Sequence, residues 1–129
     1  MNQQSTQLPA DLPVHHRQMK IEAIIRPHVV ADVQENLTEI GVTGMTILEV
    51  RGTGRLQGHH AIYRGAEYEV SFIPKIKLDV VVRESQVKQV IDAIVRASKT
   101  GEIGDGKIFV SPVEDTIRVR TNESGDNAL

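Results

Sequence analysis

The chain has 129 residues and a formal net charge of -2, with 15 basic and 17 acidic residues, so no global field favours nucleic acid. The absence of cysteine excludes disulfides, thiol catalysis and cysteine metal sites, and fits a reducing cytoplasm. No apolar run approaches the length of a membrane span, and the N-terminus lacks the apolar stretch of a signal peptide. We therefore expect a soluble cytoplasmic protein that neither binds nucleic acid nor inserts into a membrane.

The N-terminal segment, residues 1–18, differs in character from the rest of the chain. It is polar and shows no periodicity, so we predict a disordered lead followed by a single domain over residues 19–129. His15 and His16 are adjacent but lack further ligands at a supporting spacing, so a solvated tail is preferred to a metal site.

The first half of the domain has the pattern of a strand, a helix and a second strand. Residues 19–26 alternate between apolar and polar side chains, which predicts a strand that ends at Pro27. A helix closed by Gly41 and a strand over residues 45–51 follow. The apolar face of this helix consists of Val30, Val33, Leu37 and Ile40. The next segment, Thr53–Glu67, is polar with little periodicity, and connections of this length are usually functional.

The second half repeats this order. Apolar residues of one parity from Val70 to Val82 predict the clearest strand, and Ser85 is a candidate cap for the helix that follows. Lys107–Val110 and Thr116–Thr121 are predicted to be short strands. The predicted buried stripe of the helix is Val87, Val90, Ile91, Ile94 and Val95. This order indicates an α+β fold, a ferredoxin-like βαββαβ sandwich with a long loop between strands 2 and 3.

The segment Thr100–Lys107 is the strongest candidate for a binding site. Its glycines, Gly101, Gly104 and Gly106, permit a sharp turn and remove side chains that would keep a ligand away. Successive backbone N–H groups in such a turn can converge on an anion, and Lys107 adds a mobile positive charge. The spacing is not that of a Walker A loop. We therefore predict a phosphate-binding loop, although a purely geometric glycine-rich turn stays open as the alternative.

Two arginines form a second candidate. Arg118 and Arg120 alternate with Ile117 and Val119, so both guanidinium groups are expected on the same face of the last predicted strand. Arginine presents a planar fork suited to phosphate. The pattern alone is equally typical of two solvated arginines on an edge strand.

Several short motifs occur in a fixed order: Gly44–Thr46, Gly54–Arg55, Tyr63–Tyr68, Phe72–Lys75, Thr100–Val110 and Ile117–Thr121. Together they closely resemble the PII signal-transduction proteins, the nitrogen regulators of bacteria, archaea and plastids. The resemblance covers residues 19–129. It implies a ferredoxin-like homotrimer that acts as a regulatory sensor and not as an enzyme, with no catalytic residues. The chain offers no obvious base aimed at water, which disfavours the competing hypothesis of a slow ATPase.

The resemblance implies an adenine-nucleotide site, three per trimer, that exchanges ATP and ADP. In the family the arginines reach across the subunit boundary, while the glycine loop holds the nucleotide from the neighbouring subunit. The implied nucleotide-binding residues are Ile24, Thr46, Gly54, Arg55, Asp79, Val81, Gly104, Asp105, Gly106, Lys107, Arg118 and Arg120.

The implied co-ligand site departs from the family pattern. Nitrogen-sensing members have a glutamine that holds magnesium between ATP and 2-oxoglutarate, and this chain has Leu56 at that position, whose side chain offers no oxygen ligand. Lys75, which matches the lysine that pairs with a carboxylate of 2-oxoglutarate, is retained. One hypothesis is that Gln57 or water replaces the ligand and 2-oxoglutarate is still sensed. In the other, magnesium and 2-oxoglutarate are lost, and the protein reports adenylate state or bicarbonate for carbon or other metabolism.

The long loop is the implied partner-binding element. Tyr68 matches the tyrosine that is uridylylated in proteobacterial relatives, and Tyr63 matches its companion. Alternatively, Tyr68 simply begins a strand, where tyrosine is favoured. Arg64 is expected to contact the protein target, such as an ammonium transporter or a metabolic enzyme of nitrogen assimilation.

Overall fold

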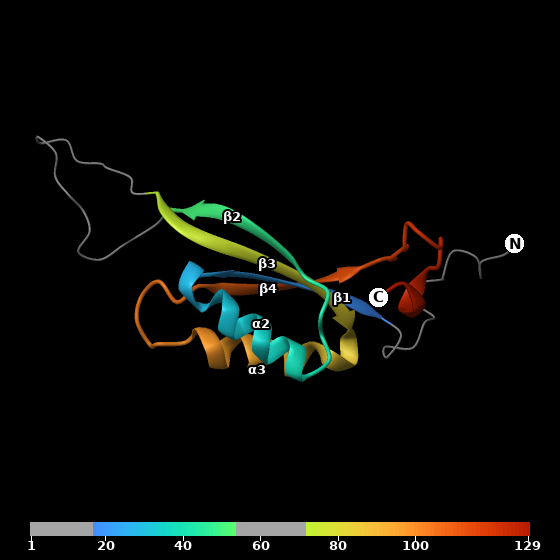
Figure 1. The fold of residues 1–129 in the computed structure, drawn as a ribbon, viewed down its shortest axis with the longest axis horizontal. Coiled ribbons are helices and arrows are strands. Elements are labelled where there is room, and N and C mark those ends of the chain that lie inside the picture. Colours follow the sequence, from blue (N-terminus) through green and yellow to red (C-terminus); the bar gives the residue numbers. More distant parts are fainter. Residues whose placement is uncertain (1–16, 54–71) are drawn as a thin grey trace, which may run out of the picture.

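A computed structural model describes residues 17–53 and 72–129; residues 1–16 and 54–71 lie outside the described part (Figure 1). No helix among the described residues is long and apolar enough to cross a membrane. In chain order the strands and α-helices are β1 (Gln18–Ile25), α2 (Val30–Glu39), β2 (Thr46–Gly52), β3 (Ile73–Arg83), α3 (Val87–Ser98) and β4 (Lys107–Val113). Short 3₁₀ turns are η3 (Pro27–Val29), η4 (Glu84–Gln86) and η5 (Gly125–Ala128).

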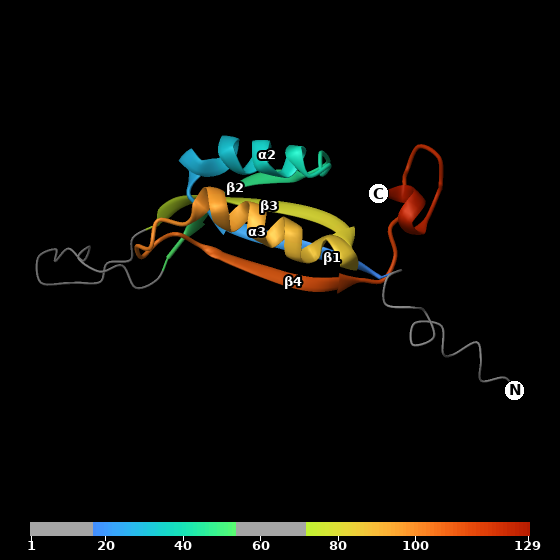
Figure 2. The same ribbon diagram turned by 90° about the horizontal axis from the view of Figure 1, so that it is seen from below.

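The described strands form one antiparallel sheet in the order β2-β3-β1-β4. Helices α2 and α3 both pack on one face of this sheet and leave the other face of the described part open (Figure 2). The arrangement confirms the predicted ferredoxin-like βαββαβ sandwich. Strand β1 lies between β3 and β4, so its position is fixed from both sides.

The core lies between the sheet and the helices. Alternate residues of β1 are buried, and Ile21 is paired with Val80 of β3 while Ala23 is paired with Leu78. Val33 and Leu37 of α2 and Val90 and Ile94 of α3 cover them from the helix layer. The opposite parity of the same strands therefore lies on the open face, as the predicted period of two requires.

Helix α3 begins and packs differently from the prediction. Ser85 is not its cap, because η4 precedes the helix and the Gln86 side chain accepts a hydrogen bond from the Arg83 amide at 3.2 Å. Val95 is 40% exposed and is not part of the buried stripe, whereas Ala93 is buried. Each residue advances about 100° around a helix, so Val95 is turned away from the inner line through Val90 and Ile94.

The last predicted strand, Thr116–Thr121, is wrong. Ile117 makes only an isolated bridge with Ser124, and the chain turns between them with Asn122 at a φ of 64°. The Arg118 amide donates to the Glu123 carbonyl at 2.8 Å, and the Asn122 amide donates to the Arg118 carbonyl at 2.7 Å. The alternation of apolar and charged residues therefore belongs to a tight reversal beyond the sheet.

The corrected stripe of α3 predicts losses of stability of different size for two neighbouring residues. Ile94→Ala removes a side chain with 0% exposure, so we expect a loss of about 2–5 kcal/mol in stability. Val95→Ala is the matched control, and we expect a loss below about 1 kcal/mol at this exposed position. Urea denaturation at one fixed protein concentration measures both, and equal losses would contradict the assignment.

Candidate glycine-loop binding site

The predicted glycine loop connects the end of α3 to the start of β4 and lies beside the C-terminal end of β1 (Figure 1). Gly101, Gly104 and Gly106 adopt φ values of 91°, 106° and 116°, which side chains rarely tolerate. A Cβ atom added at Gly106 would collide with the Ile24 carbonyl of β1. Glycine therefore lets the loop backbone lie directly against the end of the central strand.

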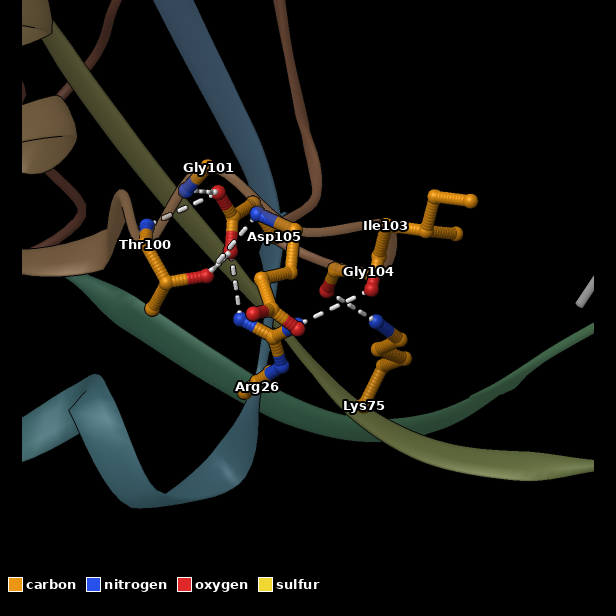
Figure 3. Close-up of polar contacts among 8 residues, drawn as sticks. Arg26, Lys75, Thr100, Gly101, Ile103, Gly104 and Asp105 are labelled. Atoms are coloured by element: carbon orange, nitrogen blue, oxygen red, sulfur yellow. Dashed lines mark hydrogen bonds and ion pairs between the residues drawn. The ribbon is translucent and has the colours of Figure 1, made fainter. Parts of the chain in front are cut away.

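The Asp105 carboxylate lies at the centre of this loop (Figure 3). It accepts hydrogen bonds from the Thr100 amide and the Gly101 amide, both at 2.8 Å, and from the Thr100 hydroxyl at 2.6 Å. Arg26 Nη1 donates a further bond at 2.5 Å. The side chain thus ties the start of the loop to its end, and its oxygens are engaged inside the loop.

Two cationic side chains hold the outer part of the loop. Arg26 Nη2 donates to the Ile103 carbonyl at 3.0 Å, and Lys75 Nζ donates to the Gly104 carbonyl at 2.7 Å (Figure 3). Arg26 directly follows β1, and Lys75 lies on β3. Two adjacent strands of the sheet therefore fix two successive carbonyl groups of the loop.

This network changes the acidity of two of its members. Hydrogen bonds from the Thr100 hydroxyl and amide, and then from Arg26 and the Gly101 amide, lower the pKa of the Asp105 carboxyl well below its usual value. Burial, followed by repulsion from Arg26, lowers the pKa of the Lys75 ammonium, and the negative charge of Asp105 opposes this shift.

A cavity of about 440 Å³ opens beside the loop on the helix-free face of the sheet. Two cations, Lys75 and Lys107, lie in its wall together with the backbone of the glycine loop. Apolar side chains from the ends of three strands complete the wall. The lining residues are Ile24, Gly52, Thr53, Ile73, Lys75, Ile103, Gly104, Gly106, Lys107 and Phe109. The combination of an apolar surface, glycine backbone and two ammonium groups suits a ligand with an apolar body and anionic groups.

The cavity brings together only part of the predicted site. Ile24, Lys75, Gly104, Gly106 and Lys107 line it, while Asp105 supports the loop as described above.

Three other predicted residues lie further along the strands on the open face. Thr46 on β2 pairs with Asp79 on β3, and Val81 follows two residues along β3. The cavity lies at the other end of these strands, beside Gly52 and Ile73, so Thr46 is about 20 Å from Gly52 along β2, at about 3.3 Å per residue.

Arg118 and Arg120 lie at the other end of the molecule. The segment that carries them is anchored to the first residue of β1, because Gln18 bonds Thr116 and Asp126, whereas the glycine loop lies at the last residue of β1. Arg118 Nη2 donates to the Leu129 carbonyl at 2.9 Å. A strand of this length spans about 25 Å, so a single chain does not place these arginines at the cavity.

Sequence reasoning missed Arg26 and Phe109. In the sequence Arg26 resembles only the last residue of a strand, because its partner Asp105 lies 79 residues further along the chain and no local pattern connects the two. Phe109 could have been found, since it shares the strand parity of Lys107.

Six predicted residues lie outside the described part of the chain: Gly54, Arg55, Gln57, Tyr63, Arg64 and Tyr68. Within residues 17–53 and 72–129, no cluster of three His, Asp or Glu side chains could hold a metal ion.

Comparison with known proteins identifies the family. The sequence profile named Nitrogen regulatory protein P-II matches residues 18–123. The chain belongs to the P-II family. The Nitrogen regulatory protein P-II of Pasteurella multocida is 56% identical over 110 residues, which cover 85% of this chain and 98% of the relative. Nitrogen regulatory protein P-II 1 of Escherichia coli is 53% identical over the same shares. Members are regulatory signal-transduction proteins and not enzymes, as the resemblance implied.

Two solved structures of P-II proteins share the fold. Arabidopsis thaliana PII bound to citrate is 41% identical with a TM-score of 0.74, over 93% of this chain and 99% of that chain. The Bacillus subtilis GlnK-ATP complex is 34% identical with a TM-score of 0.75, over 88% and 97%. Both confirm the P-II architecture of this chain.

The lowered pKa of Asp105 predicts how the loop responds to acid. A carboxylate whose pKa is lower in the folded state than in the unfolded state stabilises the fold at pH values above the unfolded-state pKa. This contribution is lost as the pH falls from there toward the folded-state pKa. We expect Asp105→Asn to lower the thermal midpoint by a constant amount between about pH 5 and 8 and by less below about pH 4. Thermal melts of both proteins across this range provide the measurement, and a difference that already shrinks near about pH 6 would contradict it.

Proposed function

We propose that this P-II protein is a regulatory sensor that binds ATP or ADP in clefts between the subunits of a homotrimer. The observation that carries the proposal is the cavity beside the glycine loop, where Ile24, Lys75 and Lys107 face the same space as the glycine backbone. An apolar surface for a base and cations for phosphates are the two chemistries that an adenine nucleotide requires. The GlnK-ATP complex, which shares this fold, supports the choice of ligand.

The charge of a triphosphate supports a second subunit in the site. Among the described residues, the cavity wall contains two ammonium groups, Lys75 and Lys107, whereas ATP has up to four negative charges. The guanidinium of Arg26 is paired with Asp105 and adds little net charge. Arg118 and Arg120 are too far away within one chain, so we infer that they reach the phosphates from a neighbouring copy.

The other residues at a distance from the cavity fit the same division. Thr46, Asp79 and Val81 share the open sheet face but lie further along β2 and β3 from the ends of these strands that line the cavity. We propose that these three residues contact the adenine and ribose from the neighbouring subunit. Each site then combines the glycine loop and Ile24 of one copy with this surface and the arginines of the next.

The output of the sensor is assigned to the segment between β2 and β3. We propose that Gly54 and Arg55 contact the nucleotide where this segment begins, and that Tyr63 and Arg64 contact a protein target. Tyr68 is a candidate for uridylylation. A ligand must prefer one state of the segment by about 1–3 kcal/mol to give useful coupling. We propose that the protein acts in the cytoplasm and that its target is either an ammonium transporter or a metabolic enzyme of nitrogen assimilation.

Calorimetric titration with ATP tests the proposed site. We expect the wild-type protein to bind ATP, and we expect both Lys107→Ala and Arg118→Ala to weaken binding by about tenfold or more, because each removes a charge from the phosphates. Steady formation of ADP that is lost in Lys107→Ala would instead support an ATPase.

Mixed trimers distinguish a site between subunits from a site within one chain. After subunit exchange, a mixture of Lys107→Ala and Arg118→Ala contains interfaces in which an intact loop faces an intact Arg118, so tight ATP binding should return in part. Mixing Lys107→Ala with the double variant Lys107→Ala/Arg118→Ala is the matched control and should restore nothing. No recovery in the first mixture would place Arg118 outside the neighbour's site.

A second candidate function follows from Leu56. The residue lies outside the described part, but the leucine side chain has no oxygen to offer magnesium. In this alternative the protein reports adenylate state or bicarbonate and has lost magnesium-dependent sensing of 2-oxoglutarate. Lys75 is relevant to both alternatives, because it donates to the Gly104 carbonyl and an effector carboxylate would compete for the same ammonium group.

Titration of ATP with magnesium, with and without saturating 2-oxoglutarate, separates these alternatives. If Gln57 or water replaces the missing ligand, ATP binding should tighten by about fivefold or more with 2-oxoglutarate. If magnesium sensing is lost, we expect unchanged ATP affinity and no heat from 2-oxoglutarate. A parallel titration with bicarbonate then tests the other anion.

A further inference from the structure

We propose that Arg26 is a positioning residue that preorganises the glycine loop for phosphate and neutralises the carboxylate inside it. The proposal rests on the proposed function, since it assigns a role at the same nucleotide site. Arg26 does not line the cavity, whereas Ile103, whose carbonyl it contacts, does. Its influence on a ligand must therefore pass through the groups that it holds.

The backbone conformation of Arg26 is fixed by contacts that do not involve its side chain. The residue follows β1, which is paired on both sides, and precedes Pro27, which starts η3. A residue before proline is restricted to extended conformations, and Arg26 has φ -70° and ψ 146°. The side chain is 22% exposed and extends from this point into the loop. The guanidinium is thus held by the rigid centre of the sheet.

The planar fork of the guanidinium contacts two loop groups at once. Nη1 donates to the Asp105 carboxylate at 2.5 Å, and Nη2 donates to the Ile103 carbonyl at 3.0 Å (Figure 3). The Ile103 carbonyl shares a planar trans peptide with the Gly104 N–H, so fixing the carbonyl turns that N–H to the opposite side. Lysine could not reproduce both contacts, because it offers one compact ammonium in place of a fork.

Electrostatics give Arg26 a second effect. Asp105 is an ionised carboxylate next to the loop backbone that is proposed to hold phosphates, and it would repel them if its charge were exposed. The contact with Arg26 balances this charge within the loop. Loss of Arg26 should therefore weaken the binding of each ligand in proportion to its phosphate charge, whereas a purely structural defect would weaken the binding of all ligands alike.

The test compares ATP, ADP and adenosine in calorimetric titrations of the full-length protein. Arg26→Met approximately keeps the length of the side chain. In this variant we expect the affinity for ATP to fall by about tenfold, the affinity for ADP to fall by less, and the affinity for adenosine to fall by no more than about twofold. Arg26→Lys should recover part of the ATP affinity. Arg96→Met replaces an exposed arginine of α3 and is the matched control.

Amide hydrogen exchange of the ligand-free proteins gives a readout that does not depend on any nucleotide. We expect faster exchange over residues 101–106 in Arg26→Met than in the wild type, with the core of α3 unchanged. Equal weakening of ATP and adenosine, or unchanged loop exchange, would overturn the role of Arg26. If the wild-type protein does not bind ATP, the proposed function fails and the phosphate-binding role of Arg26 fails with it. The exchange comparison then still decides whether Arg26 holds the loop.

Discussion

The glycine loop depends on the hydrogen bonds that the Asp105 carboxylate accepts. Glycine makes the positive φ values of this segment possible but does not select them, because glycine also populates many other conformations. Selection comes from the donors that converge on the carboxylate: the amides of Thr100 and Gly101, the Thr100 hydroxyl and the Arg26 guanidinium. A carboxylate with this many donors is stabilised in its charged form. The depressed pKa and the fixed loop are therefore two results of the same contacts.

The two faces of the sheet carry different tasks. The helix-covered face contains the buried Ile, Val and Leu side chains, and the open face carries the cavity and the charged residues of β1 and β3. Strand β1 connects the two faces, since its buried residues belong to the core, while Ile24 near its end and Arg26 directly after it lie against the glycine loop. A site built on the end of a central strand is held more precisely than one built on loops alone.

Much of the fold and part of the site could be predicted from the sequence. The alternation in β1 and β3 coincides with real burial, so the period of two gave the sheet and its inner face correctly. The same alternation misled at Ile117 and Val119, which are 56% and 97% exposed in a reversal beyond the sheet. Alternation of apolar and polar residues indicates a strand only where one set of alternate side chains is buried, and burial cannot be read directly from the sequence. Arg26 was missed for a related reason, because a contact between distant parts of the chain leaves no local pattern.

The rigidity of the glycine loop limits where switching can occur in the proposed sensor. Above about pH 5 Asp105 stays ionised, and its donors come from the loop itself and from Arg26 after a paired strand, so the contacts that hold the loop include no nucleotide. A ligand shifts an equilibrium only through a difference in affinity between two states, and a loop with one state offers none. In the proposed site the variable contacts must therefore be Lys75, whose ammonium group an effector carboxylate would compete for, the arginines of the neighbouring copy and the segment between β2 and β3. In the proposed sensor the loop holds the phosphates, and these other elements report which ligand is bound.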